Sequence, residues 1–120
     1  MSKYPEITPD LVAKSDADQP VLYDAARGNE DAQLWLAHFY LAQADTLGID
    51  GIGGASARLN SACTFAGLAA SHGRVDAIRI YSECLKLRQG PDAIATQNLI
   101  AKLDAAIEGR KDTKRVKVKI

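Results

Sequence analysis

Apolar residues recur at intervals of three and four along most of the chain, the spacing of an amphipathic helix. The strict alternation that is typical of strands is nearly absent before residue 110. The pattern predicts five to six helices, at about residues 8–14, 19–27, 29–45, 55–72, 74–87 and 92–108. Glycine and proline separate these segments, and Gly28, Gly73 and Gly109 are placed to end helices. The expected fold class is therefore all-α.

The segment 29–45 carries the clearest helical pattern. Asn29 is a suitable N-cap, and the negative charges of Glu30 and Asp31 fall in the first turn, where a helix favours them. Two apolar stripes run along this segment: one consists of Ala32, Trp35, Leu36, Phe39 and Tyr40, and the other of Leu34, Ala37, Leu41 and Ala44. A helix that is apolar on two faces packs from two sides, so we expect this helix to be central.

A short pattern of alanine and glycine recurs along the chain. It is found at 24–28 (Asp-Ala-Ala-Arg-Gly), 69–73 (Ala-Ala-Ser-His-Gly) and 105–109 (Ala-Ala-Ile-Glu-Gly). The three glycines are 45 and then 36 residues apart, and an insertion in the glycine-rich segment 46–54 explains the difference. Small residues let two helix backbones approach closely, and each glycine permits the left-handed turn that joins antiparallel neighbours. Such helix pairs cannot bury their faces alone, so they stack.

These residues, in this order, resemble the Sel1-like repeats, which are relatives of tetratricopeptide repeats. The first unit is matched by Gly28, Ala32, Leu36, Tyr40, Ala69, Ala70 and Gly73, and the second by Gly73, Ala77, Ala105, Ala106 and Gly109. The sequence departs from the family pattern at Ala37 and Ser82, where glycine is usual, and at Leu85, where tyrosine is usual. The resemblance covers residues 18–109. It implies a scaffold or adaptor for protein partners and supplies no catalytic residues.

We therefore predict a right-handed stack of antiparallel helix pairs, a short Sel1/TPR-like α-solenoid. Two repeats are few, because about three are usually needed for a stable array. The first and last helices are expected to act as caps, or a second copy of the chain to extend the stack as a homo-oligomer.

Composition and charge add a division of the chain into two parts. The 120 residues are 47% apolar, which is typical of one globular domain. Fifteen basic side chains balance fifteen acidic ones, but residues 1–108 carry a net charge of −5 and residues 109–120 a net charge of +5. We expect a single helical repeat domain at 1–109 and a basic tail at 110–120. Two cysteines and the absence of a long apolar run favour a cytoplasmic location without membrane contact.

The residues that could carry chemistry fit structural roles better. Neither His38 nor His72 has a metal-ligand neighbour at helical spacing, and the glycine-rich segment lacks the order of a phosphate-binding loop. Cys63 and Cys84 fall on the inward stripes of consecutive helices and can face each other there. We interpret them as small core residues, because a redox pair needs an exposed, electropositive setting. The sequence thus predicts no enzyme, cofactor or metal site.

These observations favour a non-enzymatic protein–protein interaction module, an adaptor or a small inhibitor of bacterial or phage origin. Trp35 is expected in the core, with a partly exposed partner pocket as the alternative. The tail alternates Val116, Val118 and Ile120 with lysines, and is open to three interpretations: a solubilising segment, strand addition to a partner, or salt-sensitive binding of nucleic acid, as a subunit of a larger complex. The candidate contact residues are Trp35, His38, Asp50, Arg58, Arg110, Lys111, Lys114, Arg115, Lys117 and Lys119.

Overall fold

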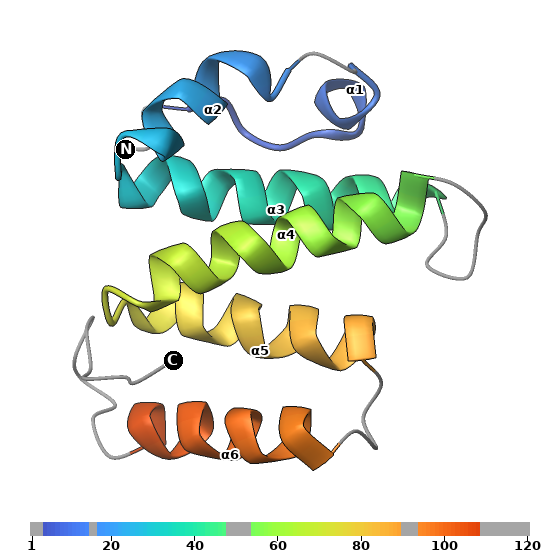
Figure 1. Cartoon of the computed structure of the whole chain (residues 1–120). Coiled ribbons are helices and arrows are strands. Elements are labelled where there is room, and N and C mark those ends of the chain that lie inside the picture. Colours follow the sequence, from blue (N-terminus) through green and yellow to red (C-terminus); the bar gives the residue numbers. More distant parts are fainter. Residues whose placement is uncertain (1–3, 15–16, 48–53, 90–93, 109–120) are drawn as a thin grey trace.

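The computed structural model describes residues 4–14, 17–47, 54–89 and 94–108. These residues form six helices and no strand (Figure 1). The helices are α1 (Pro9–Val12), α2 (Gln19–Ala26), α3 (Glu30–Leu47), α4 (Gly54–Ala70), α5 (Val75–Gln89) and α6 (Ile94–Glu108). The predicted all-helical fold class is confirmed for this part of the chain. Within the same ranges, no helix combines the length and apolar character that crossing a membrane requires.

The predicted helix limits hold to within a few residues, and the differences have local causes. Helix α1 is a single turn, shorter than the predicted segment 8–14. Helix α3 extends to Leu47, two residues beyond the predicted end at residue 45. The Thr46 hydroxyl donates a hydrogen bond of 2.9 Å to the Ala42 carbonyl, one turn earlier in the helix. This bond lets a residue of low helix propensity take part in the last turn.

At the described helix ends, side chains cap the first turns and glycines follow the last ones. The Thr8 hydroxyl accepts a hydrogen bond of 3.2 Å from the Leu11 amide, and the Asn29 side chain accepts one of 2.9 Å from the Ala32 amide. Gly28 and Gly73 have φ angles of +93° and +86°, in the left-handed region where a side chain would be strained. Gly28 and Gly73 therefore mark true helix ends, and Gly109 lies outside the described residues.

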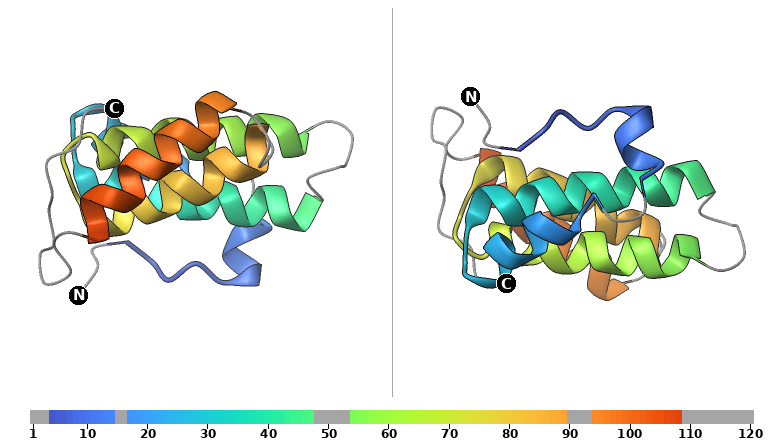
Figure 2. Two further views of the ribbon diagram at one scale, coloured as in Figure 1. Left: turned by 90° about the horizontal axis from the view of Figure 1, so that it is seen from below. Right: turned by 90° about the horizontal axis from the view of Figure 1, so that it is seen from above.

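Helices α3 to α6 alternate in direction, and each packs against the next (Figure 1). Helix α3 contacts α1, α2, α4 and α5, which confirms the central position expected from its two apolar stripes. Seen along the direction of stacking, α3 and α4 lie on opposite sides of the molecule, and α1 lies on the α3 side (Figure 2). The chain that precedes α1 therefore runs beside α3.

The core follows the stack of helices and is rich in alanine. Its two largest fully buried side chains are Phe39 and Leu36 of α3, each 0% exposed. Helices α4 and α5 approach very closely at Gly67, where a Cβ atom would lie 3.2 Å from Cε1 of Tyr81. On the side of α6 that faces away from α5, the described exposed residues are polar or small except Ile94, which is 75% exposed.

Candidate functional site

Residues 4–12, here called the N-terminal segment, lie along α3 and are held there through their backbone. The indole Nε1 of Trp35 donates a hydrogen bond of 2.8 Å to the Pro5 carbonyl, and the side-chain Nε2 of Gln43 donates one of 3.3 Å to the Val12 carbonyl. At the start of the segment, the Tyr4 hydroxyl donates to Asp24 at 2.8 Å. Side chains of α3 thus bind a stretch of chain through carbonyl groups, which every residue type possesses.

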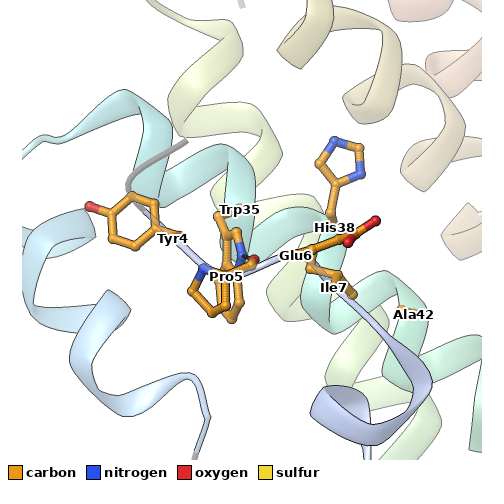
Figure 3. Close-up of a pocket in the computed structure, with 7 residues that line it drawn as sticks. All are labelled: Tyr4, Pro5, Glu6, Ile7, Trp35, His38 and Ala42. Carbon is orange, nitrogen blue, oxygen red and sulfur yellow. Dashed lines mark hydrogen bonds between the residues drawn. The ribbon is translucent and has the colours of Figure 1, made fainter. Parts of the chain in front are cut away.

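A groove of about 590 Å³ lies between the N-terminal segment and α3 (Figure 3). It is lined by Tyr4, Pro5, Glu6, Ile7, Trp35, His38 and Ala42. Five of these seven residues are apolar or aromatic, and Glu6 and His38 supply the ionisable groups. An apolar groove with a few polar groups is the usual form of a binding site for a peptide or a small molecule.

Trp35 belongs to both the core and the groove. Its side chain is 7% exposed, and its ring stacks on Phe39 with centroids 5.0 Å apart and planes 10° apart. The Tyr4 ring covers it from the N-terminal segment at 6.3 Å. The expected core position of Trp35 is therefore confirmed, and the edge that remains accessible lines the groove.

His38 is exposed and contributes a neutral imidazole to the groove at physiological pH. Desolvation lowers the pKa of His38 below its usual value, although the carboxylates of Asp76 and Glu83 on α5 act to raise it. Glu6 and Glu83 are exposed. Over the whole described part of the chain, eight basic and eleven acidic side chains give a net charge of −3. The groove therefore lies in a weakly acidic setting.

The structure does not bring the other candidate residues to this groove. Arg58, on α4, lies with its guanidinium carbon 6.0 Å from the ring centroid of Tyr40, whose hydroxyl donates a hydrogen bond of 2.6 Å to buried Asp18. Arg58 does not line the groove. The remaining candidates fall outside the described residues: Asp50, Arg110, Lys111, Lys114, Arg115, Lys117 and Lys119.

Arg74 makes a contact between distant helices that the sequence analysis missed. Its guanidinium forms ion pairs with Asp31 at the start of α3 and with Asp76 at the start of α5, the latter at 2.8 Å. Burial alone would raise the pKa of Asp76, but the Arg74 guanidinium and the Ala77 backbone amide bring it below its usual value. Position 74 directly follows a helix-ending glycine, which is a signal for a cap and not for this pairing.

Residues 4–7 were also missed as groove residues. Pro5 takes part through its carbonyl group, so its side chain gives no signal, and the contact with Trp35 spans 30 positions of sequence. Among the described residues, no three His, Cys, Asp or Glu side chains are grouped so that they could hold a metal ion. No protein-family model, no curated protein and no solved structure matches this chain.

Proposed function

We propose that this protein is a non-enzymatic protein–protein interaction module that binds an extended segment of a partner protein in the groove between the N-terminal segment and α3. The observation that carries the proposal is the way in which α3 already holds a segment of chain. Trp35 and Gln43 bind carbonyl groups, and apolar surface lies beside these bonds. Recognition through the backbone, with side-chain pockets between the bonds, is one established way of binding an extended peptide.

The helical arrangement supports the same proposal. Antiparallel helices that each pack on the next are what a short Sel1/TPR-like solenoid would require, and the alanine-rich interfaces fit the close packing inferred from the repeat. The polar outer side of α6 is suited to a cap.

The chemistry of the groove indicates the partner segment. Its walls are apolar, its imidazole is neutral at physiological pH, and its exposed carboxylates include Glu6. An extended segment that alternates aliphatic residues with lysine or arginine would bury its aliphatic side chains and meet complementary charge. The net charge of −3 on the described residues also favours a basic protein segment over nucleic acid as the ligand of this body.

A displayed library of random peptides tests the proposal. Ala42 lines the groove, so Ala42→Glu fills it with a charged side chain. Ala101 is exposed on α6, and Ala101→Glu adds the same charge away from the groove. We expect the wild-type protein and Ala101→Glu to enrich peptides that alternate aliphatic and basic residues, and Ala42→Glu to lose them. Because Trp35 is the single tryptophan, its fluorescence should change when such a peptide is added.

Two results would contradict the proposal. One is enrichment of the same peptides by Ala42→Glu and the wild-type protein, which would place binding outside the groove. The other is an enriched set dominated by acidic peptides, which would show that the charge argument is wrong. Circular dichroism of both variants checks that the glutamate has left the helical fold intact.

A further inference from the structure

Cys63 of α4 and Cys84 of α5 belong to one buried cluster, and the helices that carry them pack against each other. Neither cysteine forms a disulfide, and both are buried, with exposures of 1% for Cys63 and 0% for Cys84. Gly67 lies one turn after Cys63, and Tyr81 lies about one turn before Cys84. Because the two helices are antiparallel, the close contact of Gly67 with Tyr81 lies one helical turn away from the level of the two cysteines. The glycine at position 67 allows the two helices to approach, and the two cysteines lie at the next level of the same contact.

The two thiols differ in their electrostatic environments. A hydrogen bond with Cys84 lowers the pKa of Cys63, and the exposed Arg88 guanidinium, one turn beyond Cys84, acts in the same direction. The same hydrogen bond, together with burial, raises the pKa of Cys84. Of the two thiols, Cys63 is therefore the one that ionises more readily.

We propose that Cys63 and Cys84 form a dithiol–disulfide pair, which a low-molecular-weight disulfide such as oxidised glutathione converts into a covalent link between α4 and α5. Helix α4 packs on α3 and helix α5 on α6, so the link fastens one helix pair to the other. The proposal does not depend on what the groove binds. It differs from the expectation that these cysteines are only small core residues.

The reaction balances with this oxidant alone. The Cys63 thiolate attacks one sulfur of oxidised glutathione, a new S–S bond forms, and one glutathione leaves as a thiolate that takes up a proton. Cys84 then loses its proton to solvent and attacks the Sγ atom of Cys63, which displaces the second glutathione. The protein gives up two protons and two electrons, and one glutathione disulfide becomes two glutathione molecules. Because both thiols are buried, the first step requires a local opening of the α4–α5 contact and is slow.

Intact-mass spectrometry and thermal unfolding of the full chain test the proposal. The reduced protein is incubated with oxidised glutathione in mildly alkaline native buffer. We expect the mass to fall by two hydrogens without a lasting glutathione adduct. We also expect the Tm to rise by about 10 °C, because the link constrains the unfolded chain. Cys84→Ala should stop at one glutathionyl group on Cys63, and the double variant Cys63→Ala/Cys84→Ala should keep its mass.

The unfolded chain provides the decisive comparison. If the native protein keeps its mass while the same chain in guanidinium chloride oxidises with the same reagent, the fold holds the thiols apart and the proposal is wrong. A disulfide that forms in native buffer but lowers the Tm would equally overturn it, since the helices would have to move to accommodate the bond.

Discussion

Tyr4 anchors the start of the N-terminal segment, and Tyr4→Phe removes only the anchoring hydroxyl. The variant deletes the 2.8 Å hydrogen bond to Asp24 and keeps the ring that covers Trp35. A buried hydrogen bond to a charged acceptor contributes about 1.5–3 kcal/mol. Tyr4 and Asp24 are both partly exposed, so water replaces part of the interaction, and we expect a loss of about 1 kcal/mol. The segment should then detach roughly fivefold more often.

The single tryptophan provides the assay. Trp35 is 7% exposed while its Nε1 atom donates a hydrogen bond to the Pro5 carbonyl. Detachment of the N-terminal segment therefore exposes the indole ring. We expect acrylamide to quench Trp35 fluorescence more efficiently in Tyr4→Phe than in the wild-type protein. Tyr23→Phe is the matched control, because the Tyr23 side chain is 65% exposed and its hydroxyl accepts a hydrogen bond only from Arg27 at the surface. Equal quenching in the two variants would refute the idea that the Tyr4 hydroxyl holds the segment on α3.

Three further variants or conditions address the core, the ion pairs and the tyrosine environment. Phe39→Ala, which truncates a side chain with 0% exposure, should lower the free energy of unfolding by about 3–5 kcal/mol in chemical denaturation, and an unchanged value would contradict its core position. Arg74→Gln should lower the free energy of unfolding by less than about 1 kcal/mol, because the side chains of Asp31 and Asp76 are 70% and 54% exposed. The loss should shrink in high salt. A larger loss that does not depend on salt would show that the packing of Arg74 matters more than its charge. Partial burial and the hydrogen bond to Asp24 raise the pKa of Tyr4 from 10.0 to about 12, so the folded state keeps a proton that the unfolded chain loses. This contribution to stability should be complete below pH 10 and decline between pH 10 and 12, and urea unfolding across this range should show a smaller decline for Tyr4→Phe.

The helices and their inward faces were predictable because the information for them is local. The spacing of Ala32, Leu36 and Phe39 marks the buried side of α3 without reference to any other helix, and all three residues are 0% exposed. Gly28 and Gly73 likewise mark helix ends through their own backbone conformations. The inward positions of Cys63 and Cys84 followed from the same periodicity.

The groove was less predictable because it depends on contacts between distant segments. Trp35 and His38 were recognised as candidates from residue type, but the wall opposite them is formed by residues 4–7, whose part in the groove no local pattern encodes. The bond from Trp35 to Pro5 uses a carbonyl group, and the position of the segment depends on Tyr4 meeting Asp24 twenty positions away. Only the packing of the complete fold brings these groups together.

Gly67 and Tyr81 share one small volume between α4 and α5. A Cβ atom at position 67 would lie 3.2 Å from the ring, so added bulk there requires either a shift of the Tyr81 ring or a smaller residue at position 81. Sequences of common descent should therefore vary at these two positions together. Such a correlated exchange would identify a remote relative of this protein even after its solvent-facing residues had diverged completely.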